Sequence, residues 1–129
     1  MSEQVVAAGP EAVAREYIDA VGEKRLEALP ALLHPEMAFL LGDTVQDSDA
    51  YLAALQRLTT ILLRNEIRRV FVDGDDVCVI YDFVTDTPVG AVRSIEWLTL
   101  QDGRIRTIRL LFERERWPEV MAELAKRTS

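Results

Sequence analysis

Two runs of alternating apolar and polar residues, joined at Gln101-Asp102-Gly103, form the clearest pattern in the sequence. A period of two is typical of β-strands, and Asp-Gly favours a tight turn because glycine readily adopts positive φ. We therefore predict a β-hairpin over residues 91–113. Large apolar side chains occur on both faces of its first strand, so we expect both faces to be covered. The carboxylate of Glu96 lies in the middle of that strand.

The remaining spacing predicts further helices and strands. Helical spacing occurs over residues 10–22, 25–33, 48–63 and 117–126, and Pro30 is expected to shorten or split the second of these helices. Apolar runs or period-two alternation predict strands over residues 37–41, 67–72 and 77–87. Helices come first and an antiparallel meander comes last, which is an α+β layout.

Composition narrows the class of protein. The chain has 129 residues and a formal net charge of -7, so we expect one domain over residues 10–127, preceded by a tail over residues 1–9. An acidic chain without a basic stripe argues against a nucleic-acid partner. No run of about 18 apolar residues and no signal-peptide pattern occurs, so we predict a cytoplasmic protein with no membrane partner. Cys78 and His34 are the only residues of their types, and we predict no metal site and no cofactor.

The order of elements resembles that of a known superfamily. Helix, short helix, strand, helix and four long strands, together with AREYIDAVGEKRLEALPALLHPEMAFLLGD and DGRIRTIRLLFERERW, resemble the nuclear transport factor 2-like superfamily over roughly residues 10–117. That superfamily holds ketosteroid isomerases, limonene epoxide hydrolases, SnoaL-like polyketide cyclases and non-catalytic domains. The resemblance implies a cystatin-like α+β fold, in which a curved antiparallel sheet wraps around the N-terminal helices and forms a cone-shaped pocket.

The resemblance also implies site residues. Tyr17 matches the helix tyrosine, and Glu96 the strand acid, of the ketosteroid isomerase oxyanion hole. The isomerase base falls at or near Leu41, and the aspartate that hydrolases and cyclases place on the last strand is Leu110 here. We predict Tyr17 and Glu96 as catalytic residues. The predicted ligand-binding residues are Phe39, Leu41, Tyr81, Phe83, Leu98, Ile108, Leu110 and Phe112.

Two classes of function follow. In the first, the protein is an isomerase, cyclase or hydrolase that uses Glu96 as acid or base, and Tyr17 as oxyanion or hydrogen-bond donor, on a small apolar carbonyl-bearing molecule. In the second, it is a non-catalytic ligand-binding or dimerisation module, in which Glu96 is only a polar anchor. In either case we expect burial to raise the pKa of Glu96, and its carboxyl to lie within direct or one-water reach of the Tyr17 hydroxyl.

The convex face of the sheet is the implied dimer interface. Ile95, Trp97 and Arg109 would lie on it with Arg93 and Thr107. Ile95 and Trp97 would otherwise form an exposed apolar patch, so we predict a homodimer. Asp82 is expected on the same face, in an ion pair with Arg93 or Arg109.

Overall fold

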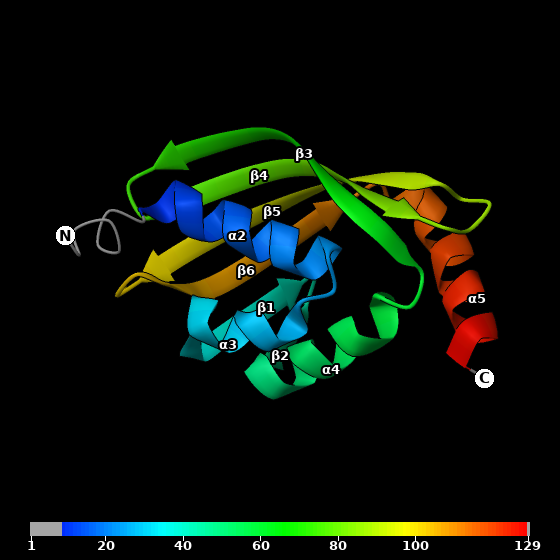
Figure 1. Ribbon diagram of the computed structural model, residues 1–129, viewed down its shortest axis with the longest axis horizontal. Coiled ribbons are helices and arrows are strands. Elements are labelled where there is room, and N and C mark those ends of the chain that lie inside the picture. The colour runs from blue at the N-terminus through cyan, green and yellow to red at the C-terminus, as the bar shows by residue number, and fades with distance from the viewer. Residues whose placement is uncertain (1–8, 129) are drawn as a thin grey trace.

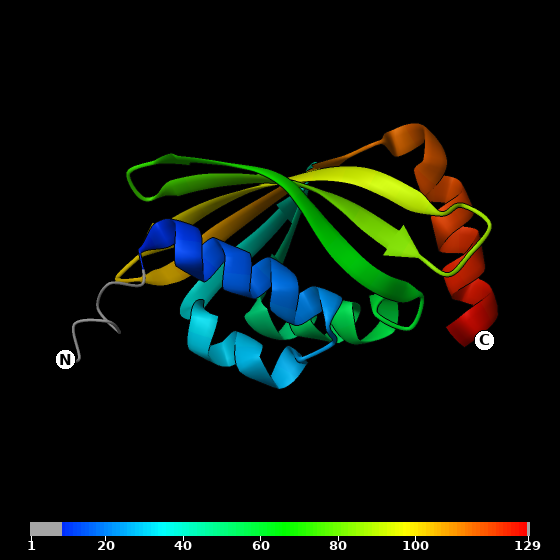
Figure 2. The same cartoon turned by 45° about the horizontal axis from the view of Figure 1, so that its top comes forward.

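A curved six-stranded sheet and the helices against it make up the fold (Figures 1 and 2). The computed structural model describes residues 9–128, so the predicted tail lies almost wholly outside the described residues. The helices are α2 (Pro10–Gly22), α3 (Leu29–Leu32), α4 (Ser48–Leu58) and α5 (Trp117–Thr128), with 3₁₀ turns at Leu26–Ala28 and Arg114–Arg116. The strands are β1 (Leu33–Leu41), β2 (Thr44–Asp47), β3 (Leu62–Asp73), β4 (Asp76–Thr85), β5 (Ala91–Gln101) and β6 (Arg104–Phe112).

The sheet has the strand order β2-β1-β6-β5-β4-β3. Strands β3 to β6 form the predicted antiparallel meander, whereas β1 pairs with β6 in parallel. The β1–β6 register shifts between Leu33 and Ala38, where Pro35 lies. Proline has no backbone N–H to donate, so it is tolerated at such an irregularity. The predicted curved sheet is therefore present, with one parallel pair that the pattern did not reveal.

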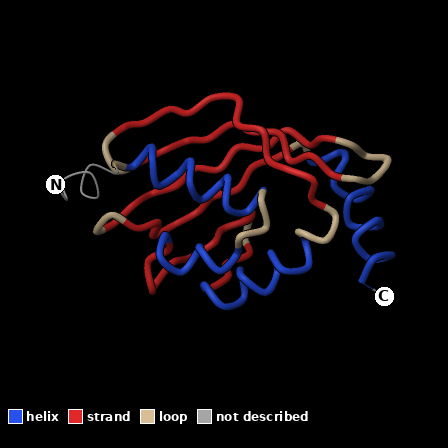
Figure 3. The backbone as a smooth tube through the Cα atoms, in the orientation of Figure 1, coloured by secondary structure: helices blue, strands red, loops and turns tan. Residues whose placement is uncertain are grey.

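The predicted hairpin is formed by β5 and β6. Asp102 and Gly103 occupy its turn with φ of 56° and 78°. The turn fixes the register in which Glu96 pairs with Leu110, and Leu98 with Ile108. Figure 3 shows these long strands beside the helices that cover the concave face of the sheet. Because side chains alternate between the two faces of a strand, Glu96 points to the same face of β5 as the buried Leu98.

Helix α2 lies directly against strand β3. Tyr17, Ile18 and Val21 form part of its buried face, as the spacing predicts. Gly22 permits the close approach, because a Cβ at this position would meet the backbone nitrogen of Asn65 at 2.8 Å. Asn65 fixes the same contact by donating its Nδ2 to the carbonyl oxygen of Ile18 at 3.1 Å.

Several element boundaries differ from the prediction. Helix α4 ends at Leu58 rather than at residue 63, and β3 already begins at Leu62. The hydroxyls of Thr59 and Thr60 donate to the carbonyls of Gln56 and Arg57, which gives the last turn of α4 partners outside the helix ladder. Strand β1 begins at Leu33 rather than at residue 37, β4 ends at Thr85, and Pro30 splits the second helix as expected. The short strand β2 was not predicted.

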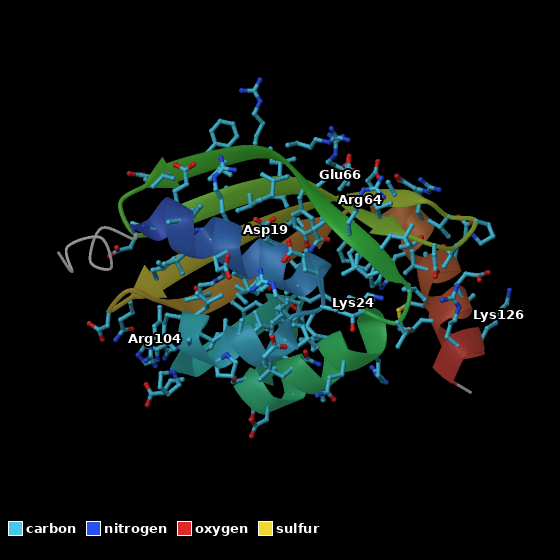
Figure 4. All side chains as sticks on the ribbon, in the orientation of Figure 1. Asp19, Lys24, Arg64, Glu66, Arg104 and Lys126 are labelled. Carbon is cyan, nitrogen blue, oxygen red and sulfur yellow. The ribbon has the colours of Figure 1, made fainter. Side chains whose placement is uncertain are left out.

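The outer face of the sheet carries an ion-pair network. Asp82 is buried and accepts hydrogen bonds from Arg93, as expected, and from the Nε of Arg68 at 2.8 Å. Arg68 also pairs with Glu66, which in turn pairs with Arg64; Figure 4 shows Arg64 and Glu66 together on β3. These ion pairs connect strands β3, β4 and β5 on the convex face of the sheet. Within the described residues, no helix is long and apolar enough to cross a membrane.

Candidate functional site

Glu96 is a buried carboxyl on the concave side of the sheet. Glu96 is only 5% exposed. It lies on the buried face of strand β5, whereas Arg93, Trp97 and Gln101 lie on the opposite, exposed face. Across the sheet it is paired with Val79 of β4 and Leu110 of β6. Apolar residues therefore surround an ionisable group. Burial of such a group costs free energy unless hydrogen bonds replace those it made with water.

The three tyrosines of the chain supply these hydrogen bonds. The hydroxyl of Tyr17 donates to Oε1 of Glu96 at 2.9 Å, and the hydroxyl of Tyr81 donates to Oε2. The hydroxyl of Tyr51 is hydrogen-bonded to that of Tyr17. A phenol has one proton, and Tyr17 uses its proton on Glu96, so Tyr51 is the donor in the tyrosine pair. The hydrogen bonds run from Tyr51 through Tyr17 to Glu96, and Tyr81 completes the arrangement.

Burial dominates the electrostatics of this cluster. It raises the pKa of Glu96 above the ordinary value, and the hydrogen bonds from Tyr81 and Tyr17 lower that pKa only in part. Burial, together with the Glu96 charge, also raises the pKa of each tyrosine well above its usual range. Within the described part of the chain, no arginine or lysine is hydrogen-bonded to Glu96. The direction of the pKa shift and the direct Tyr17 contact agree with the predictions.

A small cavity opens beside the carboxyl. Its volume is about 60 Å³, which is well below the ~300 Å³ or more of a typical small-molecule site. Polar groups at its wall are Glu96, Tyr51, Tyr81, Ser94 and Asn65. The other lining residues are apolar: Val21, Phe39, Leu55, Leu58, Phe83, Leu110, Phe112 and Trp117. The cavity is thus large enough for the reacting end of a ligand and not for the whole molecule.

A larger groove adjoins the cavity. Its volume is about 260 Å³. Six residues line both the groove and the cavity: Phe39, Tyr51, Leu55, Leu58, Leu110 and Trp117. Helix α5 covers one side of this groove with Trp117, Met121 and Leu124. Tyr51 faces both spaces, and its ring stacks on Phe39 with the centroids 4.4 Å apart. A ligand in the groove can therefore extend towards Glu96.

The structure gathers most of the predicted ligand-binding residues around these two spaces. Phe39, Leu41, Tyr81, Phe83, Leu110 and Phe112 line the cavity, the groove or both. Leu98 and Ile108 do not line either space, because they are fully buried in the core. Tyr17 is also fully buried and is not part of either wall. Its hydroxyl contacts Glu96, as expected, and also Tyr51, but it does not face the cavity or the groove, in contrast to the expected donor to the ligand.

Sequence reasoning missed several residues of the site. The predicted site residues do not include Tyr51, Ser94, Asn65 or Trp117, which all line the cavity. For Ser94 a signal existed, since it lies two residues before Glu96 and therefore on the same face of β5. Within residues 9–128, no three His, Cys, Asp or Glu side chains are grouped as metal ligands.

Comparison with known proteins identifies a family to which most of the chain is similar. Residues 14–108 match the family model described as a SnoaL-like domain. No significant match occurs among curated proteins. The match begins within helix α2, ends within strand β6 and includes every polar residue at the cavity wall.

Solved structures share the fold. An NTF2-like protein of unknown function from Cytophaga hutchinsonii is 18% identical, with a TM-score of 0.71 over 84% of this chain and 93% of that chain. IdmH, a candidate polyketide cyclase from Streptomyces antibioticus, is 18% identical, with a TM-score of 0.72 over 88% and 98%. A candidate ketosteroid isomerase from Kribbella flavida is 19% identical, with a TM-score of 0.71 over 81% and 78%. Together they identify the predicted nuclear transport factor 2-like fold.

Proposed function

The chain belongs to the SnoaL-like domain family, and on this premise we propose that it is an isomerase or cyclase of a small apolar carbonyl-bearing molecule. One observation carries the proposal. Glu96 is a buried carboxyl at the wall of a cavity, held by two phenol donors, with no cationic partner within the described residues. Similarity to proteins named as a candidate polyketide cyclase and a candidate ketosteroid isomerase supports the same reaction class.

Glu96 is the acid/base in this proposal. Its carboxylate removes a proton from the carbon next to the ligand carbonyl. In isomerisation it returns that proton to another carbon; in cyclisation the enolate carbon attacks a second carbonyl, and the proton passes to the alkoxide oxygen that this attack forms. Burial raises the pKa of Glu96, which makes the carboxylate a stronger base than an exposed glutamate. A single carboxyl can perform both transfers, so the leucines at positions 41 and 110 do not prevent isomerisation.

Tyr81 couples proton transfer to stabilisation of the oxyanion. Its hydroxyl donates to Oε2 of Glu96 and its side chain lines the cavity. When Oε2 takes up the substrate proton, it becomes a donor towards the Tyr81 oxygen, and the Tyr81 proton is free to turn to the enolate oxygen. The hydrogen bond to the developing negative charge then forms as the charge appears.

Tyr17 has a positioning role in this scheme. Its hydroxyl donates to Oε1 of Glu96 and accepts from Tyr51, so it fixes the orientation of the carboxyl from behind. Because it is not at the cavity wall, it acts on the reaction through Glu96.

Exchange of carbon-bound protons tests the proposal without knowledge of the natural substrate. 2-Tetralone, a flat apolar ketone, is incubated in D₂O, and deuterium incorporation next to the carbonyl is followed by NMR. Wild-type protein is expected to accelerate exchange, and Glu96→Gln to abolish the acceleration. Glu27→Gln is the matched control, since Glu27 is exposed and lies outside the cavity wall. Equal rates for wild type and Glu96→Gln would contradict the catalytic role of Glu96.

A non-catalytic binding module is the second candidate. Glu96 is the only Asp, Glu or His among the residues that line the cavity, which favours binding because many acid/base enzymes use a pair of such groups. This candidate predicts that 2-tetralone binds with no acceleration of exchange. Titration of the ketone by NMR, in the same samples, separates the two functions.

A further inference from the structure

The groove beside the Glu96 cavity carries a cation on an otherwise largely apolar wall. Arg57 of helix α4 and Gln46 of strand β2 both line it. Their neighbours in the groove include Leu41, Tyr51, Leu110 and other apolar groups. A guanidinium and an amide at one apolar groove are suited to an acidic group on a mainly apolar ligand.

Arg57 has no carboxylate partner within the described residues, and neither do Arg69, Arg104 and Arg109, but of these only Arg57 lines the groove. Arg68 and Arg93 pair with Asp82, and Arg127 pairs with Asp86. The chain carries 22 Asp and Glu residues against 15 Lys and Arg, so acidic partners are abundant. The positive charge of Arg57 is therefore left available at the groove.

Helix α4 explains part of this arrangement. Arg57 lies in the last turn of α4, where any positive charge stabilises the helix dipole. That role does not require a place at the groove wall. It also makes no distinction between arginine and lysine, whereas recognition of a planar acid in two contacts favours arginine.

We propose that Arg57 binds an acidic group of the ligand, so that the substrate is an apolar carbonyl compound that bears a carboxylate, sulfonate or phosphate. The acidic group lies at the open groove, the apolar body lies on Leu110 and Trp117, and the carbonyl enters the cavity at Glu96. The inference rests on the proposed function, because it names the substrate class of the same site.

Two dyes that differ in one acidic group test the inference. Anilinonaphthalene sulfonate is anionic, and phenylnaphthylamine has the same rings without the sulfonate. Both should become fluorescent on binding wild-type protein. Arg57→Ala is expected to raise the dissociation constant of the sulfonate dye five- to tenfold and to change that of the neutral dye by less than twofold. Arg57→Lys should fall between wild type and Arg57→Ala for the sulfonate.

Two further variants assign the effect to the groove. Arg69→Ala removes an exposed arginine of β3 outside the groove and should leave both affinities unchanged. Ala54→Trp fills the groove and should weaken both dyes, because Ala54 is part of its wall. Added salt should weaken the sulfonate in wild type more than in Arg57→Ala, since salt screens exposed charges.

The outcomes separate the inference from the proposed function. Equal losses of the two dyes in Arg57→Ala, or no loss of either, would overturn the role of Arg57. Failure of both dyes to bind wild type would overturn the inference and the pocket together. A selective loss of the sulfonate, combined with no Glu96-dependent proton exchange, would retain the acid-binding groove and reject the enzyme.

Discussion

Tyr17 of helix α2 and Glu96 of strand β5 are 79 residues apart in the sequence, and the Tyr17 hydroxyl donates to Oε1 of Glu96 at 2.9 Å. The contact connects the first helix to the middle of the sheet. It exists because Tyr17 is on the buried face of α2 and Glu96 on the inward face of β5. The helix and the carboxyl are therefore coupled, and changes in either should be measurable in the stability of the whole domain.

The first prediction concerns the pH dependence of stability. The pKa of Glu96 is raised by burial above its ordinary value of 4.5, so the folded protein favours the protonated carboxyl. The contribution of Glu96 is fully present below the unfolded-state pKa and is lost as pH rises through the folded-state pKa. The free energy of unfolding of wild type minus that of Glu96→Gln should therefore fall from about pH 4.5 upward and then level off.

Urea unfolding at a series of pH values measures this difference. Glu27→Gln serves as the control, because Glu27 is exposed and lies outside the cavity wall. A difference that rises with pH would mean that the hydrogen bonds from Tyr17 and Tyr81 outweigh burial.

The second prediction compares two hydroxyl deletions. Tyr17→Phe removes the donor to Oε1 of Glu96 and also the acceptor of the buried Tyr51 hydroxyl. Tyr81→Phe removes the donor to Oε2, and Ser94, which also hydrogen-bonds to the Tyr81 hydroxyl, keeps its donation to the carbonyl oxygen of Val92. An unpartnered buried polar group costs about 1–3 kcal/mol, so Tyr17→Phe should destabilise the protein by about 1 kcal/mol more than Tyr81→Phe. Urea unfolding at one pH measures both, and equal losses would show that Tyr51 finds another partner.

The sequence was sufficient to predict the architecture and the central pair of the site. Period-two alternation and the Asp-Gly turn predict the hairpin, and the resemblance to the nuclear transport factor 2-like superfamily implies that Glu96 faces inward. Helical spacing puts Tyr17 on the buried face of α2. The alternation and the helical spacing are local signals, because each depends only on residues within one element and on the direction of their side chains.

The remaining site residues depend on contacts between distant elements. Tyr51 is not among the predicted site residues, since helical spacing can show that a tyrosine is buried but not which group its hydroxyl contacts. Its partner Tyr17 is 34 residues away in the sequence. Strand β2 was missed because TVQD is short and polar, and it forms only through pairing with β1. The end of α4 was misplaced because an apolar residue, Leu62, begins β3 at a position that also fits the helix pattern.

A third prediction tests the close approach of α2 to β3. On helix propensity alone, Gly22→Ala would stabilise the protein by up to about 1 kcal/mol. The added Cβ would instead meet the Asn65 backbone nitrogen at 2.8 Å, so we expect destabilisation of about 1–3 kcal/mol. The sign of the change in urea unfolding decides between the two effects. A stabilised Gly22→Ala would show that α2 and β3 separate without cost.

The last prediction is that the protein is a homodimer through the convex face of the sheet. Phe71, Cys78 and Trp97 lie side by side across three strands, and Ile95 and Leu111 are paired in the next row. Phe71 is 57%, Trp97 41% and Leu111 57% exposed, which leaves an apolar patch beside the ion pairs of Asp82. Arg109 lies over the Trp97 ring, with its guanidinium carbon 5.5 Å from the ring centroid. Burial of this patch in a second copy would remove its apolar side chains from water.

Trp97→Glu should convert the dimer to a monomer, because the substitution places a negative charge in the middle of the patch. Sedimentation velocity at micromolar concentration measures the change. Met121→Glu is the matched control, since Met121 is 43% exposed on helix α5 and lines the groove on the concave side of the sheet, and its replacement should leave the mass unchanged. A monomeric wild type, or a Trp97→Glu variant that remains dimeric, would reject this face as the interface.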